Sequence, residues 1–166
     1  MDGEGTLRRV ADAMASAIRA DAVVAASAGR VTVCVEDRQD METAISEALG
    51  KAGGICVMVG IAGFERRAQS GPVLQGTVSI EVRAMEVPAL NRSSPDGAWM
   101  TAQGLTERLA LALHWRRLPG MTEMLRFRRF VREDGDAVNV ARGFWELEQS
   151  LVGPAHGTTE GNGKEG

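Results

Sequence analysis

The sequence has no tyrosine, and aromatic residues make up only 4% of its 166 residues. Aliphatic side chains must therefore fill most of the core. Two histidines and two cysteines offer few metal ligands, and neither a Cys-x-x-Cys nor a His-Glu-x-x-His motif occurs. Cys34 and Cys56 both lie within apolar runs, which favours two reduced, buried thiols over a disulfide. We therefore expect no metal site.

Catalytic motifs are also missing from the sequence. The stretch GKAGG around Lys51 lacks the glycine spacing and the Ser or Thr that a P-loop requires, so Lys51 is expected to be a solvated charge. His114 is the one histidine outside the presumed C-terminal tail, and no Gly-x-Ser-x-Gly motif accompanies it. The sequence therefore predicts no catalytic residues and no cofactor, and we expect the protein not to be an enzyme.

Length and charge narrow the class of protein further. A chain of 166 residues with a net charge of −3 suits one core and does not suggest a surface built to bind nucleic-acid phosphates. No apolar run approaches the roughly 18 residues of a membrane helix, and the N-terminal segment carries acidic residues where a signal peptide carries basic ones. We expect one domain over residues 1–152, a disordered glycine-rich tail over 153–166, no membrane contact and a cytoplasmic place of assembly.

Hydrophobic periodicity predicts the order helix, strand, helix, two strands, helix, two strands. This order predicts an α+β (mixed α/β) fold, in which a mostly antiparallel four- to five-stranded sheet packs against two to three helices. The expected elements are helices over 6–28, 40–54 and 99–114 and strands over 30–37, 54–63, 76–87, 123–134 and 137–151.

Single residues mark the expected limits of the helices. Thr6 is the predicted N-cap of the first helix, and Gly29 is the predicted end of that helix. In the third helix, Leu111 and Ala112 are expected to widen the apolar stripe.

The strand segments carry further signals. The apolar run 54–63 lacks alternation, which predicts a central strand covered on both faces. The run 76–87 alternates strictly and ends before Pro88, which has no N–H to donate to a ladder. The alternation slips near Arg129, which predicts a bulge. Residues 64–76 surround a Ser-Gly-Pro sequence and are predicted to form a long hairpin loop, a mobile arm.

Basic residues gather in two places. Arg66 and Arg67 lie in the predicted loop, and a second group follows the third helix. One interpretation of the second group is a solvated strand face balanced by nearby acidic residues. The other is an electrostatic contact with an acidic neighbouring subunit or with DNA that passes close by. The basic residues of the second group are Arg116, Arg117, Arg126, Arg128, Arg129 and Arg132, and the acidic ones are Glu133, Asp134 and Asp136.

The stretch MEVPALNRSS, residues 85–94, connects the alternating strand to the third helix. A strand that ends in Glu-x-Pro followed by Asn-Arg, and then a helix that ends in Ala-Leu-His, resembles the tail-terminator (tail-completion) proteins of long-tailed bacteriophages and prophages. The loop departs from a compact Pro-x-x-Asn-Arg-Gly form by Ser93, Ser94 and Pro95. The matching residues are Glu86, Pro88, Asn91 and Arg92 in the connection and Ala112, Leu113 and His114 in the helix.

The resemblance covers the layout of residues 6–151 and implies a structural role in the virion, without catalysis or cofactor. Proteins of this family form a ring, expected to be hexameric, at the head-proximal end of the tail tube. The ring ends tube polymerisation and offers a surface for head–tail joining. The implied partners are further copies of this chain, the tail tube protein and the head–tail connector protein, with DNA only as cargo that passes through the ring.

Two alternatives remain open at the level of sequence: a head–tail connector or neck protein, and a small-molecule-binding regulatory α/β domain. For the terminator role, Asn91 would form an Asx-type turn that directs Arg92 at a carboxylate or carbonyl of a neighbouring subunit. The candidate subunit and partner contacts are Arg66, Arg67, Asn91, Arg92, Arg128 and Arg129.

Overall fold

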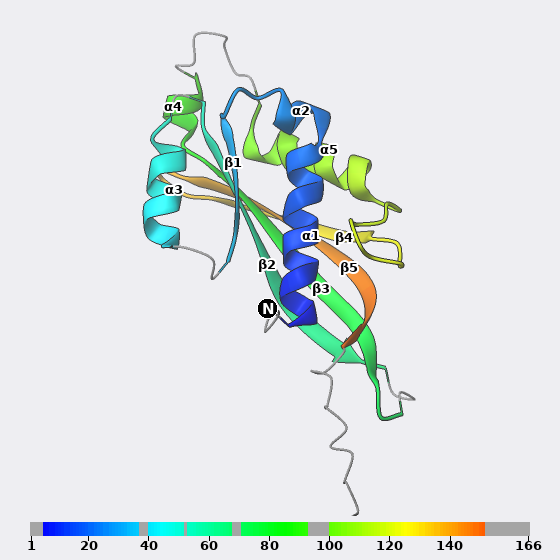
Figure 1. Ribbon diagram of the computed structural model, residues 1–166. Helices are drawn as coiled ribbons and strands as arrows, with labels where there is room; N and C mark the ends of the chain where they lie inside the picture. The colour runs from blue at the N-terminus through cyan, green and yellow to red at the C-terminus, as the bar shows by residue number, and fades with distance from the viewer. Residues whose placement is uncertain (1–4, 37–39, 52, 68–70, 93–99, 152–166) are drawn as a thin grey trace, which may run out of the picture.

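The computed structural model describes residues 5–36, 40–51, 53–67, 71–92 and 100–151 (Figure 1). Trp99 and the predicted tail 153–166 lie outside the described residues. The helices are α1 (Thr6–Ala20), α2 (Ala22–Ala25), α3 (Met41–Leu49), α4 (Pro88–Arg92) and α5 (Ala102–Leu113). The strands are β1 (Val31–Val35), β2 (Ile55–Arg66), β3 (Leu74–Glu86), β4 (Arg126–Asp134) and β5 (Asn139–Leu151).

The strands form one five-stranded sheet in the order β1-β2-β3-β5-β4. β1 pairs with β2 in parallel, and the other pairings are antiparallel. The longest pairing joins β3 and β5, from Leu74 opposite Leu151 to Glu86 opposite Asn139. The predicted α+β fold, a single domain with a mostly antiparallel sheet, is confirmed.

One face of the sheet, called the packed face below, lies under α1 and α5 (Figure 1). Trp145 of β5 is fully buried on this face, and its indole lies across Gly143, where a Cβ atom would come within 2.4 Å of the ring. Each large apolar side chain buried in this layer contributes roughly 1.5–3 kcal/mol. The alternation predicted for β3 is confirmed, because its residues on the packed face, all fully buried, are Val78, Ile80, Val82 and Ala84.

The opposite face, called the open face below, has a described helix only over its β1–β2 corner. There Ala48 of α3 packs on Cys56 and Met58 of β2, so the first half of β2 is buried on both faces, as its unbroken apolar run predicts. Cys34 and Cys56 are free and buried, which confirms the two reduced core thiols. Elsewhere the side chains of β3 and β5 on this face are half-buried and mostly polar.

The first predicted helix is broken into two. α1 ends at Ala20, and the carboxylate of Asp21 accepts hydrogen bonds from the backbone N–H groups of Val23 (3.0 Å) and Val24 (3.4 Å), which starts α2. The same carboxylate binds Arg108 of α5 at 2.9 Å. A continuous helix over 6–28 was therefore the wrong prediction, because an aspartate side chain competes for backbone N–H groups. The N-cap of α1 is Gly5 rather than Thr6.

The predicted loop 64–76 is also shorter than expected. β2 continues to Arg66 and β3 begins at Leu74, and the backbone N–H of Arg67 still donates to the carbonyl of Gln75 at 2.8 Å. Both ends of this segment, Phe64–Arg66 and Leu74–Gly76, are therefore strands of a β-hairpin and not part of a long loop. Strand pairing extends this far because each added ladder step satisfies backbone groups that a loop would leave to water.

The connection after β3 differs from the prediction as well. Residues Pro88–Arg92 form the short helix α4, so Asn91 has helical backbone instead of the expected Asx-type turn. Pro88 stands at the first helical position, where its missing N–H costs nothing and its fixed φ suits the helix. Pro88 still ends β3, as predicted.

Two further details concern α5 and β4. Leu111 does not widen the buried stripe of α5, because its side chain is 85% exposed. Two positions from Leu109 on a helix is about 200° of rotation, which places Leu111 on the opposite side of the buried stripe. The register of β4 against β5 shifts between Phe127 and Arg129, which confirms the predicted bulge. No helix among the described residues has both the length and the hydropathy to cross a membrane.

Candidate assembly surfaces

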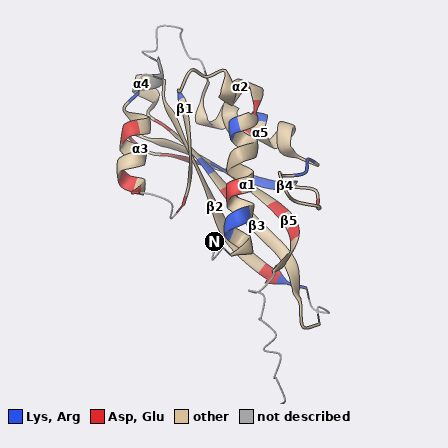
Figure 2. Cartoon of the chain, in the orientation of Figure 1, with Lys and Arg blue, Asp and Glu red and all other residues tan. Residues whose placement is uncertain are grey.

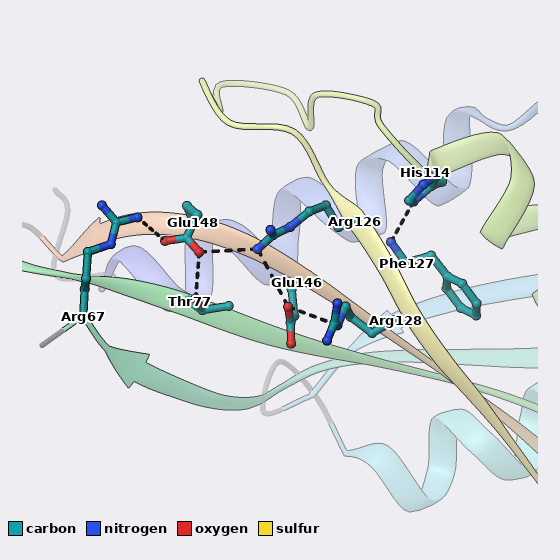
Figure 3. Close-up of polar contacts among 8 residues, drawn as sticks. All are labelled: Arg67, Thr77, His114, Arg126, Phe127, Arg128, Glu146 and Glu148. Carbon is teal, nitrogen blue, oxygen red and sulfur yellow. Dashed lines mark hydrogen bonds and ion pairs between the residues drawn. The ribbon is translucent and has the colours of Figure 1, made fainter.

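The arginines of β4 meet acidic side chains of β5 on the open face (Figure 3). Arg126 lies 3.4 Å from Glu148 and 3.8 Å from Glu146, and Arg128 lies 3.3 Å from Glu146. Arg67, from the end of the β2–β3 hairpin, binds Glu148 at 2.9 Å. These five residues form a continuous chain of charges, called the distal row below.

The register of the sheet explains the distal row. Arg126 is opposite Glu146 across the β4–β5 pair, and Thr77 is opposite Glu148 across the β3–β5 pair. Thr77 donates its hydroxyl to Glu148 at 2.8 Å. The bulge adds Arg128 to β4, so two arginines approach one glutamate. Cross-strand pairing therefore holds these charges in place.

A second chain of charges, called the proximal row below, crosses the open face nearer to α3. Arg83 of β3 forms an ion pair with Glu36, which follows β1, and lies 3.7 Å from Glu81. Arg142 of β5 lies 3.5 Å from Glu81 and 3.2 Å from Glu133 of β4. This row therefore links β3, β5 and β4 with Glu36, the residue that follows β1.

Three arginines of the basic group predicted from the sequence, Arg126, Arg128 and Arg132, are thus paired with carboxylates within the chain. Acidic segments of β5 lie beside basic segments of β4 (Figure 2). The interpretation as a balanced strand face is supported, although Glu146 and Glu148 supply more of the balance than the predicted carboxylates do. Asp134 does pair with Arg132 at 2.7 Å, and the hydrogen bond raises the pKa of that guanidinium.

The six predicted contact residues lie in separate parts of the structure. Arg67 and Arg128 lie in the distal row. The guanidinium carbon of Arg129 lies 4.3 Å from the centre of the Phe144 ring. Arg66 ends β2 and is exposed. Asn91 and Arg92 end α4, which follows the far end of β3, and their side chains lie outside the described part of the structure. The structure therefore does not bring the six together.

A mostly apolar groove, called the α5–β4 groove below, lies between α5 and β4. Its volume is about 620 Å³, and Leu111 (85% exposed) and Phe130 (37%) leave apolar surface in contact with solvent. His114 lies at its end and accepts a hydrogen bond at Nδ1 from the backbone N–H of Phe127 at 3.0 Å (Figure 3). The groove is lined by Thr106, Glu107, Ala110, Leu111, His114, Phe127 and Phe130.

A smaller hollow of about 230 Å³ lies where β3 ends. Glu86 and Pro88 of the Glu-x-Pro motif line it, and Glu86 is only 4% exposed. Arg132 also lines this hollow and donates a hydrogen bond to Gln103 at 2.7 Å. The motif therefore lies where the end of β3, the start of α5 and the end of β4 meet.

Reactive groups are few in the described structure. Among the described residues, no three His, Cys, Asp or Glu side chains gather closely enough to hold a metal ion. Burial raises the pKa of the Cys56 thiol to about 12, with Cys34 adding to the shift. This thiol is therefore protonated at neutral pH, and a protonated thiol is a poor nucleophile.

The fold has a counterpart among solved structures. A chain from the structure "Virion of native gene transfer agent (GTA) particle" superposes with a TM-score of 0.57 at 14% identity, over 89% of this chain and 98% of that chain. At this identity the similarity establishes a shared fold. A second solved structure, named only by an identifier, superposes over 90% of this chain and 96% of that one with 13% identity, but its TM-score of 0.46 is too low to infer a shared fold. No family model and no curated protein matches the sequence.

The groove and the glutamate partners were not predicted from the sequence. The position of Leu111 opposite Leu109 on the helix was the one signal for the groove, because it places a large apolar side chain on the solvent side. Alternating acidic residues in WELEQ were the signal for Glu146 and Glu148, since alternation places both on one face of a strand.

Proposed function

We propose that this chain is a structural virion protein that forms a hexameric ring at the head-proximal end of a phage-type tail tube. The ring ends tube polymerisation and provides the surface for head–tail joining. The observation that carries this proposal is the shared fold with a chain of a gene transfer agent virion over 98% of that chain. The resemblance of the segment from Glu86 to Arg92 to tail-terminator proteins supports it independently.

The charge arrangement suits a ring through which DNA passes. A protein that holds DNA presents unpaired Lys and Arg side chains to phosphates, and binding strengthens with each such contact. On the open face, Arg126 and Arg128 instead bind Glu146, and Arg83 and Arg142 approach Glu81. If this face lines the channel, the paired charges let DNA slide past with little retention.

The proposed role needs contacts between subunits and no catalysis. Exposed apolar side chains, Leu111 above all, give such contacts a surface to bury. Arg92, at the end of α4, is the second proposed contact. Replacement of Arg92 by alanine is expected to lower the oligomer mass and weaken tail attachment. Unchanged mass and attachment would leave α4 as a connection that serves only the fold.

The mass of the purified protein tests the ring directly. Light scattering across a range of concentrations, followed by electron microscopy of the eluted species, should give hexameric rings with a central opening. A monomer that forms such rings only after addition of tail tube subunits also supports the proposal. A tight dimer that stays a dimer beside tail tubes would contradict it.

Two alternatives have distinct outcomes in the same experiments. A head–tail connector would form a ring that binds a head-completion ring and leaves growing tail tubes uncapped. A small-molecule-binding domain is favoured by the α5–β4 groove, whose volume of about 620 Å³ falls within the usual range of ligand pockets. The hypothesis of a small-molecule-binding domain predicts a dimer whose melting temperature rises when a metabolite is added.

A further inference from the structure

Large apolar side chains are exposed at several places on the described surface, among them Leu90 (37%), Trp115 (59%) and Met124 (38%), and two further places carry the inference below. The first is the β2–β3 hairpin, where Val73 is 50% exposed and Leu74 is 43% exposed. The second is the α5–β4 groove, with Leu111 and Phe130. Single exposed apolar residues need no explanation, but two clusters at the ends of different elements suggest complementary contacts.

Strand pairing holds the described part of the hairpin, called the arm below. Pairing of β2 with β3 continues to Arg66 opposite Gly76, and the Arg67 N–H bonds the Gln75 carbonyl at 2.8 Å. The salt bridge from Arg67 to Glu148 ties the arm to β5. Leu74, the first residue of β3, is therefore held in place and loses little conformational entropy on binding.

The arm cannot reach the groove of its own chain. Phe127 of the groove lies opposite Trp145, which lies opposite Ile80 of β3. Leu74 is six positions further along β3, roughly 20 Å away at 3.3 Å per residue. The hairpin points away from α5 at the lower end of the sheet (Figure 1). Any contact between the two surfaces therefore joins different copies.

Charge favours the same pairing. Glu107 lines the groove and is exposed, and Arg66 is exposed at the end of β2, in the arm. Within the described part of the chain, no ion pair joins Arg66 or Glu107 to another residue, and the carboxylate of Glu107 accepts one hydrogen bond, from the amide of Gln103 at 3.4 Å. A basic residue beside Val73 and Leu74 thus matches an acidic residue beside Leu111.

Strand pairing through the β4 edge is a poorer contact. The bulge at Arg128 interrupts the regular ladder of that strand, and its arginines place charge along the edge. Bulges and charged side chains on edge strands oppose pairing with another strand. The side chains beside β4, rather than its backbone, are the better docking surface.

We propose that the β2–β3 hairpin of one copy docks in the α5–β4 groove of the next copy, with Val73 and Leu74 against Leu111 and Phe130. This contact joins two different surfaces, so its repetition closes a ring if the rotation from one copy to the next divides a full turn, and gives an open chain otherwise. The proposal rests on the proposed ring and specifies how its subunits meet.

Cysteine cross-linking tests the contact, since burial protects the two native thiols. Equal amounts of Leu74→Cys and Leu111→Cys proteins are mixed and treated with a bismaleimide too short to span the distance within one copy. We expect cross-linked dimers in the mixture, and a ladder of oligomers from the double variant. A mixture of Leu90→Cys with Leu111→Cys is the matched control, because Leu90 of α4 has similar exposure (37%) at the far end of β3.

A charge exchange gives a second test in the same protein. Arg66→Glu and Glu107→Arg should each raise the concentration needed for assembly by about two- to fivefold, and the double exchange should restore it. Leu111→Asp should raise that concentration by at least about tenfold, since it removes one buried leucine from the contact. All variants should keep the melting temperature of the parent, because the altered side chains are exposed.

The outcomes separate this inference from the ring itself. Rings with no cross-link above the Leu90→Cys control, or an assembly insensitive to Leu111→Asp, would overturn the docking and leave the ring. Cross-linked chains that do not close would support the docking and overturn the ring. A protein with neither cross-links nor rings at high concentration would overturn both.

Discussion

The two faces of the sheet are built from the same strands but hold the chain together in different ways. On the packed face, Trp145 and Ile80 are fully buried under helices. On the open face, their neighbours Glu146 and Glu81 take part in chains of ion pairs. Burial of a large apolar side chain contributes a few kcal/mol, whereas an exposed ion pair contributes at most about 1 kcal/mol. Stability therefore depends mainly on the packed face.

The side chains of the open face are held in a different way. Its charges are arranged by strand register rather than by packing, so they can change partners without unfolding the chain. These charged side chains could therefore form contacts with another molecule. The variants below separate the two faces, in order of expected effect.

Adjacent residues of β5 give the largest contrast. The indole of Trp145 is fully buried and packs edge-on against Phe127, with the two ring centres 5.1 Å apart. Trp145→Ala removes this indole and should lower the free energy of unfolding by about 3–5 kcal/mol. Phe144→Ala, on the open face, should cost only about 1–2 kcal/mol, including its contact with Arg129. Urea denaturation measures both. Equal losses would show that the open face is packed as firmly as the other.

Gly143 tests how tightly the packed face is filled. An alanine Cβ there would come within 2.4 Å of the Trp145 ring, so Gly143→Ala should cost roughly 1–3 kcal/mol. In a Trp145→Leu background the same substitution should cost much less, because the clashing ring atoms are gone. A double-mutant cycle measures the coupling. Additive losses would contradict the contact.

Cys56 marks the corner where α3 covers the open face. Its pKa is raised from 9.0 to about 12 in the folded chain, so between pH 9 and 12 the unfolded chain loses this proton first. The stabilisation is complete below pH 9 and is lost as pH rises to 12. Wild type should therefore lose more stability than Cys56→Ala over this range. Identical pH dependence in denaturant titrations would contradict the burial of this thiol.

Local patterns in the sequence predict much of the fold on both faces of the sheet. The alternation of Val78, Ile80 and Val82 depends only on the two-residue period of a strand, and the apolar face of α3 depends on the helical period. The bulge near Arg129 also leaves a local sign, a slip in the alternation. Each of these features is encoded within one segment.

Features that depend on distant partners are not predicted in this way. Asp21 breaks the first helix while it binds Arg108, which is 87 residues away in sequence. The partners Arg126 and Glu148 meet only because β4 pairs with β5 in one register. The α5–β4 groove likewise exists only when helix and strand are packed together. Of the candidate surfaces, the sequence predicted the arginines and the partner Asp134, but not Glu146 and Glu148.

The distal row gives the smallest expected effect and the sharpest test of the comparison. Arg126 and Arg128 share the carboxylate of Glu146, at 3.8 and 3.3 Å. Glu146→Gln removes this carboxylate, yet it should lower the free energy of unfolding by less than about 1 kcal/mol because these side chains are partly exposed. The loss should shrink further at high salt, whereas the loss in Trp145→Ala should not. A salt-independent loss of several kcal/mol in Glu146→Gln would mean that the distal row, like the packed face, is part of what holds the sheet together.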